Sequence, residues 1–442
     1  MRFSNSDLKG MIVPLFMEQL LVLLVGIADT LVISYAGEAA VSGVSLVNMV
    51  NTIFIYLFTA LASGGAVVIS QYIGRNAPDL AGKAASQLLM FSTLLSVALT
   101  IPVLIAKDAI LKTLFGAVES DVMSSALVYL RISAYSYPAL AVYNAGVALF
   151  RSLSKTKAPM KISLVSNVIN LFGNLIGVFV LHAGVEGVAY PSLIARVFSA
   201  FAITYLCFKG EISVRYSKKW IFSWDKTLLR QILRIAIPSG VEKGLFQLVK
   251  VTLSSIVALF GTCQIAANGV AQSIWSMAAL CGLTMSPVFI TVIGQCMGSA
   301  DVHEAQAYFQ KLIKITLVIS LIWNGLIFAL TPLLMLAYNL EAETKSLVIQ
   351  LVLIHNLFNA IAYPFSGAMS SGLRAAGDVK FTTIVSIAST VAGRLTLSWL
   401  LGLVLDMGVI GIALAMCADW TIQAVLYIRR LRCGKWKQFR VV

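Results

Sequence analysis

Long apolar runs separated by short polar connections dominate this chain of 442 residues. Each run approaches or exceeds the roughly 20 residues that an α-helix needs to cross the hydrocarbon core of a bilayer. The pattern predicts an all-α integral membrane protein with twelve transmembrane helices, at about 11–34, 44–70, 84–106, 126–150, 160–182, 186–208, 232–260, 266–293, 308–331, 346–370, 379–403 and 408–428. We expect no cleavable signal peptide, because the first run is long and lacks an A-x-A-type site.

The first half of the chain is repeated in the second half. Pro14 and Glu18 return as Pro238 and Glu242, and four later pairs follow at a similar offset: Gln71/Gly74 with Gln295/Gly298, Tyr137–Pro138 with Tyr363–Pro364, Arg151/Lys157 with Arg374/Lys380, and Gly187/Ala189 with Gly411/Ala413. A duplicated apolar chain is typical of a secondary transporter built from two half-units. We expect two pseudo-symmetric six-helix lobes, 1–208 and 232–428, a cytoplasmic linker 209–231 and a basic tail 429–442.

Composition and charge placement agree with a membrane protein. Hydrophobic residues make up 59% of the chain and charged residues 12%, against about 25% charged residues in soluble proteins. The net charge of +14 is compatible with nucleic-acid binding, but Lys and Arg crowd the even-numbered connections and both termini. The positive-inside rule then places both termini in the cytoplasm. We expect a plasma-membrane protein, no nucleic-acid partner, and a basic tail that lies against anionic membrane lipid.

Asp29 is the most informative ionisable residue, because a charge inside the bilayer costs several kcal/mol. Its counterpart in the repeat is Leu253 or a neighbour, so this acid occurs in one lobe only. Helix 160–182 carries a polar stripe at helical spacing, formed by Ser163, Asn167, Asn170 and Asn174. Asn144 and Ser192 are candidates to close the same pocket. A carboxylate among amides and a hydroxyl can hold a proton or a sodium ion, whereas the alternative is that the asparagines join helices through hydrogen bonds.

Glu18 and Glu242 each lie four residues after a proline at the start of a span. One interpretation is an acid near a helix N-terminus, where the helix dipole favours negative charge. The other is a site in each lobe for a cationic substrate or a proton, to which Gln247 contributes in the second lobe.

Other polar residues in the second lobe have weaker signals. His355 and Asn356 belong to a small polar cluster in one span, where a histidine can titrate near neutral pH or serve only as a packed hydrogen-bonding group. Asp419 and Arg394 are predicted to form a buried structural ion pair. Arg196 requires a partner that the sequence does not identify.

Cofactor chemistry is not indicated by any motif. The six cysteines lack paired spacing, and there is no phosphate-binding glycine loop, metal-ligand cluster or pairing of a nucleophile with a base. We expect no metal, except possible sodium near Asp29, and no cofactor apart from a coupling H⁺ or Na⁺. We also expect no enzymatic activity and a monomer.

The chain resembles the MATE (multidrug and toxic compound extrusion) family of bacterial type. The resemblance is carried by the segment IADTLVISYAGEAAVSGVSL, the repeated Gln/Gly and Arg/Lys pairs given above, and the GVEGVA and GVIGIA entries to the sixth and twelfth spans. It implies two six-helix lobes of the MATE/MOP type that alternate between inward-open and outward-open states. It also implies export of amphipathic, mainly cationic drugs in exchange for protons or sodium ions.

The same resemblance assigns roles to residues. Asp29 matches the family's acid in the first span, Asn144 its asparagine in the fourth, and Asn170 its first polar site in the fifth. Asn174 stands where many members have an acid, and Ser192 where many have a threonine. The missing carboxylate favours protons over sodium. In the second lobe, Gln247 and the His355 cluster stand where other members have acids, which leaves Glu242 as the candidate coupling acid there.

Two other functions are alternatives to drug export. A flippase for lipid-linked oligosaccharides or precursors, from the same superfamily, tends to have a more basic cavity, whereas the spans here hold about as many acids as bases. A membrane-embedded lipid enzyme requires a convergent His/Asp/Glu cluster, and the sequence has none.

Overall fold

The computed structural model describes residues 2–116, 118–209, 212–338, 340–439 and 441–442. The described residues form α-helices with short π and 3-10 segments, and they contain no strand. Within these described ranges, eleven helices are long and apolar enough to cross a membrane. The remaining expected span, 126–150, is divided between α4 and α5, which meet at Ser136. The prediction of an all-helical, multi-span membrane protein is confirmed.

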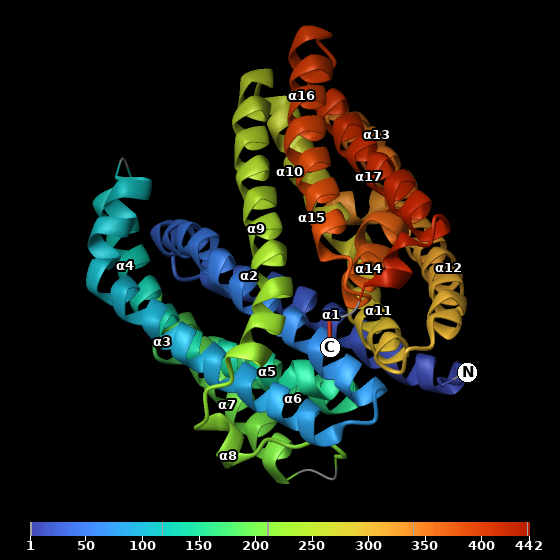
Figure 1. Cartoon of the computed structure of the whole chain (residues 1–442). Helices are drawn as coiled ribbons and strands as arrows, with labels where there is room; N and C mark the ends of the chain where they lie inside the picture. The colour runs from blue at the N-terminus through green and yellow to red at the C-terminus, as the bar shows by residue number, and fades with distance from the viewer. Residues whose placement is uncertain (1, 117, 210–211, 339, 440) are drawn as a thin grey trace. The chain divides into compact units, whose positions relative to one another are not determined.

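The first compact unit covers Phe3–Ile237. Its elements are α1 (Asn5–Ser34), α2 (Glu38–Gly74), α3 (Pro78–Phe115), α4 (Ser120–Tyr135), α5 (Tyr137–Ser152), α6 (Lys157–Leu175), η1 (Ile176–Val180), α7 (Glu186–Lys209), α8 (Lys218–Ile221) and the start of α9 (Lys226–Val257). Within this unit α6 packs against both α1 and α7 (Figure 1). Helix α1 begins at a capping box, in which Ser4 and Asp7 each bond the other's backbone N–H.

The second compact unit is formed by Pro238–Val442 together with Arg2. Its elements are the rest of α9, η2 (Ala258–Phe260), α10 (Thr262–Ala278), α11 (Leu280–Gly298), α12 (Val302–Leu334), η3 (Met335–Ala337), α13 (Ala342–Ile361), η4 (Pro364–Met369), α14 (Ser370–Ala375), α15 (Val379–Ile387), η5 (Ala388–Arg394), α16 (Leu395–Ser398), η6 (Trp399–Val404), α17 (Gly408–Arg432) and η7 (Lys435–Gln438). The chain therefore divides inside α9, between Ile237 and Pro238.

The duplication is visible in the backbone as well as in the sequence. Positive φ angles occur at matching places in the two halves, pairing Gly37 with Gly261, Asn76 with Ala300, Ser154 with Gly377, His182 with Asp406, and Gly184 with Gly408. Such angles are uncommon outside glycine, so coincidence does not explain five matched pairs. The two halves share one pattern of helices and turns.

Two repeated glycines allow close packing at the start of the last helix of each half. A Cβ on Gly187 would lie 2.6 Å from the carbonyl carbon of Gly177, and one on Gly411 would lie 2.6 Å from that of Leu401. Only glycine permits this approach. In the first unit the contact holds α7 against the end of the α6–η1 helix.

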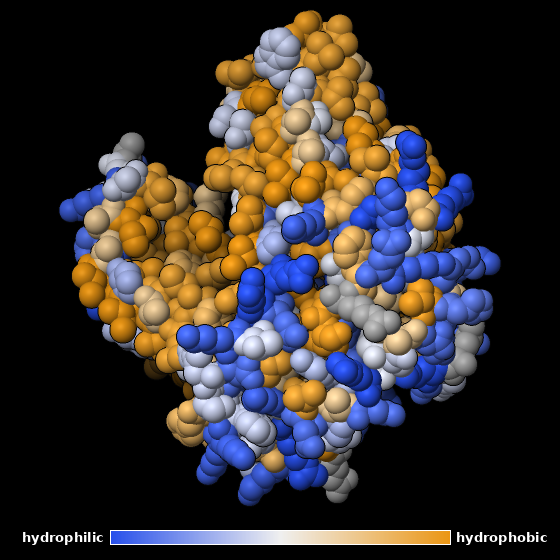
Figure 2. Space-filling model, in the orientation of Figure 1, coloured by the Kyte–Doolittle hydropathy of each residue, from blue (hydrophilic) through white to orange (hydrophobic). Residues whose placement is uncertain are grey.

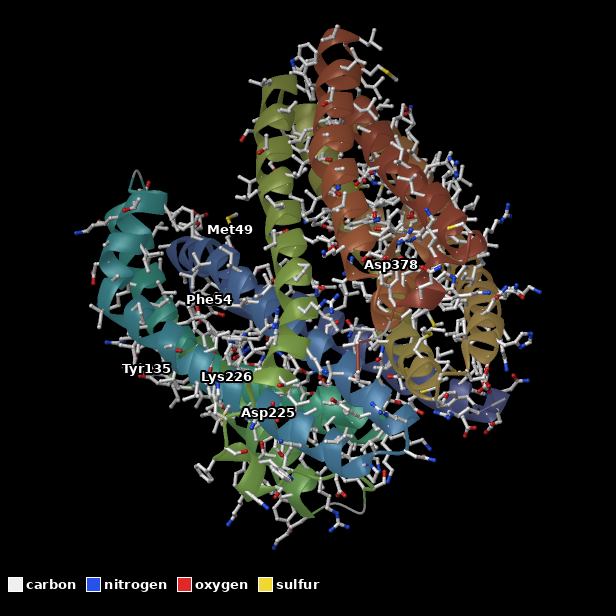
Figure 3. The ribbon with its side chains drawn as sticks, viewed as in Figure 1. Met49, Phe54, Tyr135, Asp225, Lys226 and Asp378 are labelled. Atoms are coloured by element: carbon white, nitrogen blue, oxygen red, sulfur yellow. The ribbon has the colours of Figure 1, made fainter. Side chains whose placement is uncertain are left out.

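The described part of the expected linker packs against α3. Lys83 pairs with Asp225 at 2.6 Å, Ser86 accepts a hydrogen bond from the Ser217 N–H at 3.1 Å, and the Gln87 side chain bonds the backbone of Trp220, Ser223 and Asp225. Asp225 also accepts hydrogen bonds from the backbone N–H groups of Thr227 and Leu228, which caps the start of α9. Figure 3 shows Asp225 beside Lys226 at this helix start.

The surface reflects the membrane setting. Large apolar side chains are exposed along the span helices, such as Leu31, Ile105 and Phe201. In the view of Figure 2, apolar residues cover much of the helical surface, while hydrophilic residues gather around α8 and the neighbouring connections.

Candidate functional site

A polar cavity of about 450 Å³ lies inside the first unit. Its wall is formed by side chains from α1, α2, α4, α5, α6 and α7, including Asp29, Thr30, Ser45, Asn48, Tyr129, Tyr143, Ser163, Ser166, Asn167, Asn170, Asn174, Ser192, Arg196 and Ser199. Apolar side chains such as Val22, Val25 and Leu140 complete it. This volume falls within the range of small-molecule binding sites.

Asp29 of α1 is held in this cavity by two amides of α6. Asn170 Nδ2 donates to both carboxylate oxygens, at 3.1 and 2.9 Å, and Asn174 Nδ2 donates to Oδ1 at 2.7 Å. The two asparagines lie one helical turn apart, so their side chains project from the same face of α6. The carboxylate is therefore a half-buried acceptor that faces fixed N–H donors.

Ser192 of α7 orients one of these amides. Its hydroxyl donates to Asn170 Oδ1 at 3.0 Å, which leaves the Asn170 NH₂ group directed at Asp29. Asn174 Oδ1 is buried without a hydrogen-bond partner among the described residues. That oxygen is a free acceptor on the same amide group whose nitrogen contacts Asp29.

Arg196 has the partner that the sequence did not identify. Its Nη1 donates to the hydroxyl of Ser136, at the junction of α4 and α5, at 2.7 Å. Arg196 lies on the wall of the same cavity as Asp29, and the residues that form this wall include no other Asp, Glu, Lys or Arg. The cavity thus contains one acid and one base.

Asn144 does not share this site. It lies on α5 outside the residues that line the cavity, and its Nδ2 is buried without a hydrogen-bond partner in the described part of the chain. The structure brings together Asp29, Asn170, Asn174 and Ser192, whereas Asn144 is not among the residues that line their cavity.

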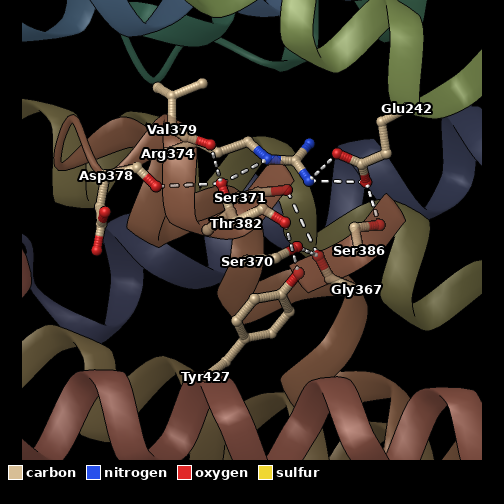
Figure 4. A network of polar contacts seen from close by, with 10 residues as sticks. All are labelled: Glu242, Gly367, Ser370, Ser371, Arg374, Asp378, Val379, Thr382, Ser386 and Tyr427. Carbon is tan, nitrogen blue, oxygen red and sulfur yellow. Dashed lines mark hydrogen bonds and ion pairs between the residues drawn. The ribbon is translucent and has the colours of Figure 1, made fainter. Parts of the chain in front are cut away.

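Glu18 and Glu242 each form an ion pair with a repeated arginine of their own unit. Glu18 pairs with Arg151 at 3.0 Å, and Glu242 with Arg374 at 2.6 Å. Ser386 also donates to Glu242 at 2.8 Å, and Figure 4 shows this network between α9, α14 and α15. Because both carboxylates already have cationic partners, these contacts favour a structural role over a free cation site.

The remaining second-lobe residues lie in buried polar surroundings. His355 and Asn356 are buried on α13, and Asn356 Nδ2 donates to the backbone oxygen of Asn324 on α12 at 3.3 Å. Gln247 lies on α9, where its Oε1 is buried without a hydrogen-bond partner among the described residues. No hydrogen bond joins Gln247 to Glu242 in the part of the chain that the structure describes.

The predicted ion pair between Asp419 and Arg394 is not formed. Among the described residues, Asp419 accepts hydrogen bonds from Ser389, Thr390 and Gln423, and no salt bridge joins it to Arg394. The Arg394 guanidinium instead lies over the ring of Phe246, at 5.5 Å from its centroid. Hydroxyl and amide groups close to Asp419 donate hydrogen bonds to its carboxylate in place of the arginine.

The structure describes no metal centre. In the described ranges, no group of three or more His, Cys, Asp or Glu side chains is placed to hold a metal ion. The chemistry available at the Asp29 cavity is therefore that of one carboxylate, one guanidinium, amides and hydroxyls.

A family model for MatE matches this chain twice, at residues 14–176 and 238–400. The chain belongs to the MatE family. The two matches correspond to the two repeated halves, and the family and fold are those of transporters rather than enzymes.

Full-length relatives extend the comparison. The chain is 28% identical to an uncharacterized transporter, YisQ, of Bacillus subtilis, over 96% of this chain and 93% of that protein. It is 23% identical to a probable multidrug resistance protein, NorM, of Thermotoga maritima, over 99% and 94% of the two chains. The outward-facing structure of a multidrug resistance MATE family transporter of the MOP superfamily superimposes with a TM-score of 0.91, at 21% identity, covering 98% and 96%. This chain is thus a multi-span membrane protein of the MATE multidrug transporter family.

Proposed function

We propose that this protein is an ion-coupled antiporter that exports amphipathic, mainly cationic organic compounds by alternating access, with Asp29 carrying the coupling ion. The observation behind the proposal is the Asp29 carboxylate, which lies in a 450 Å³ polar cavity inside an apolar lobe and contacts Asn170 and Asn174. Glu18 of the same unit has a cationic partner, Arg151. Asp29 instead accepts only amide N–H groups among the described residues.

The coupling ion that best fits this cavity is the proton. A sodium ion in a protein is usually held by several oxygen ligands, whereas the amides of Asn170 and Asn174 present nitrogen to Asp29. A proton needs only the carboxylate.

Transport would follow from competition at Asp29. While it is ionised, the carboxylate favours a cation in the cavity. Protonation removes that charge and weakens cation binding, so uptake of a proton on the outer side drives release of the organic cation. The ion and the compound are coupled because they favour different states of the carrier.

The setting we propose is the plasma membrane, with both termini in the cytoplasm and the protein as a monomer. The support is the concentration of Lys and Arg in the even-numbered connections and at the termini. The basic tail, with Arg429, Arg430 and Arg432, suits contact with anionic lipid.

The test is efflux of ethidium from proteoliposomes under a proton gradient and, separately, a sodium gradient. We expect wild-type efflux to follow the proton gradient and Asp29→Asn to abolish it in folded protein. Asp108→Asn is the matched control, since Asp108 is an exposed α3 acid paired with Lys107, and it should transport like the wild type. Undiminished efflux by Asp29→Asn would contradict the proposal.

A further inference from the structure

The cavity of the first unit holds its two charged side chains apart. Asp29 and Arg196 are the acid and the base of its wall, and no salt bridge joins them among the described residues. Their charges nevertheless act on each other across the cavity. The ionised pair therefore leaves the cavity neutral, with a negative group on α1 and a positive group on α7 that line the same space.

Hydrogen bonds from other helices fix both charged groups in place. Asn170 and Asn174 of α6 donate to Asp29, and Ser136, between α4 and α5, accepts a hydrogen bond from Arg196 Nη1 at 2.7 Å. Neither side chain can move to the other without losing these bonds, which costs free energy. A ligand that contacts both therefore has to carry its own groups at matching positions.

Arg196 has donors left for such a ligand. Its Nε and Nη2 atoms, which form one edge of the guanidinium, donate to no residue in the described part of the chain. Neither nitrogen is enclosed, because the side chain is only partly buried and lines the cavity. A guanidinium presents its donors in a plane, which matches the two oxygens of a carboxylate. The free edge of Arg196 is thus suited to an acidic group.

Charge balance favours a ligand with two opposite groups. A simple cation can bind beside Asp29, but it leaves the positive charge of Arg196 unbalanced inside an apolar lobe, where net charge is costly. A ligand with a cationic end at Asp29 and an acidic end at Arg196 keeps the occupied cavity neutral. Tyr129 and Leu140 of the same wall are available to its apolar body.

We propose that Arg196 is a specificity-determining residue of this carrier, and that its free Nε–Nη2 edge binds an acidic group of the substrate while Asp29 binds the cationic group. The preferred substrates are then amphipathic zwitterions, such as compounds with one amine and one carboxylate. The proposal rests on the transport function proposed above and narrows its substrate class. Ser136 is a positioning residue, because its hydroxyl holds the Nη1 side of the guanidinium.

Two dyes that share a cationic ring system and differ in one acidic group test this role. Rhodamine 110 has a free carboxylate, and rhodamine 123 is its methyl ester. Their dissociation constants are measured by fluorescence anisotropy with the full-length protein in dodecyl maltoside, a detergent without charge. We expect the wild type to bind rhodamine 110 more tightly than rhodamine 123. Arg196→Gln should weaken rhodamine 110 binding by about ten-fold without weakening rhodamine 123 binding.

Matched variants separate this role from general charge and folding effects. Arg131→Gln removes an exposed arginine of α4, which pairs with Glu186 at 3.8 Å, and it should leave the ratio of the two constants unchanged. Asp29→Asn should weaken both dyes, because both carry the cationic group. Ser136→Ala should reduce the preference for rhodamine 110 in part, since the guanidinium stays but loses its anchor. An equal effect of Arg196→Gln on both dyes, in folded protein, would overturn the proposal. If that variant does not fold, an unchanged ratio in Ser136→Ala would overturn it.

Two further arms identify the source of the zwitterion and the origin of a failure. Phosphatidylethanolamine, whose headgroup is also zwitterionic, is added as a competitor. If it leaves rhodamine 110 binding unchanged, the site takes the free amphiphile; if it displaces rhodamine 110, the cavity serves a lipid headgroup and the proposal fails. Equilibrium binding needs no gradient. An Arg196-dependent preference without gradient-driven transport of either dye would therefore uphold this site and contradict the antiporter function. Gradient-driven transport with no preference that depends on Arg196 would do the reverse.

Discussion

At the scale of single residues, the state of Asp29 is set by its neighbours on α6 and α7. Asn170 and Asn174 donate N–H groups to the carboxylate, and Ser192 fixes the orientation of Asn170. The donors stabilise the ionised acid without supplying a compensating charge. Such an acid can still accept a proton, whereas one locked to an arginine would do so far less readily.

The identity of residue 174 should determine the coupling ion. In Asn174→Asp a second carboxylate replaces the amide whose Nδ2 lies 2.7 Å from Asp29 Oδ1. Two carboxylates provide the oxygen ligands that a hard cation prefers. We expect sodium-gradient efflux to appear or rise in this variant, measured in proteoliposomes at fixed pH.

Asn144→Asp is the matched control for that variant. It adds the same charge at a polar position outside the cavity wall, so it should not confer a sodium response. A sodium response in Asn144→Asp equal to that of Asn174→Asp would contradict the role assigned to the cavity.

The sequence predicted part of this site because part of it follows helical spacing. Asn170 and Asn174 are one turn apart, and their grouping is visible without coordinates. The partner of Arg196 was not predictable, since Ser136 is distant in the sequence and occurs at a junction between helices. The sequence predicts the pairing of Asp419 with Arg394 from charge alone, whereas in the structure nearby neutral donors contact Asp419 instead.

At the scale of elements, the start of α9 depends on its contacts with α3. Asp225 both caps α9 and pairs with Lys83, and Gln87 holds the backbone that precedes it. The sequence predicted a polar linker here from its charge and aromatic residues. Its attachment to α3 was not predictable, because it depends on residues more than a hundred positions earlier in the chain.

The pH dependence of stability should report this attachment. The hydrogen bond from Lys83 and those from the α9 backbone hold the pKa of Asp225 below its usual value. A lowered pKa in the folded state stabilises the protein above about pH 4, and the contribution is lost as the pH falls further. We expect Asp225→Asn to lower stability by about 1 kcal/mol at neutral pH, measured by thermal unfolding in detergent.

The difference in stability between Asp225→Asn and the wild type should shrink below about pH 4, because the wild-type carboxylate is then protonated. Asp79→Asn, at an exposed acid in the first turn of α3, serves as the control. If the difference in stability between Asp225→Asn and the wild type stays constant from neutral to acid pH, the ion pair with Lys83 is not the cause of that difference.

At the scale of the whole chain, the duplication accounts for more than the order of helices. Both halves contain a buried or half-buried glutamate after a proline and an arginine that binds it, Glu18 with Arg151 and Glu242 with Arg374. The sequence showed both residues of each pair as repeats. It did not reveal that they meet, since they are more than a hundred positions apart.

These repeated ion pairs should behave as structural contacts. Glu242→Gln leaves the Arg374 charge without its partner, and we expect a loss of about 3–5 kcal/mol in stability. The double variant Glu242→Gln/Arg374→Gln should lose less than the sum of the single variants, because no unpaired charge remains. Thermal unfolding of the wild type, the two single variants and the double variant measures the coupling free energy between the two residues. The same cycle at Glu18 and Arg151 should give a coupling free energy of the same sign.

Additive losses in both cycles would contradict a structural role. A Glu242→Gln protein that is stable but has lost transport would also contradict a structural role. That result would indicate that Glu242 binds the substrate or the coupling ion.

The central claim is that Asp29 exchanges a proton for an organic cation, and proton release on substrate binding tests it most directly. Ethidium is added to purified protein in weakly buffered detergent solution, and a pH-sensitive dye records the protons released. The account predicts release by the wild type and none by Asp29→Asn. Equal release by both proteins, or no release by a wild type that binds ethidium, would contradict it.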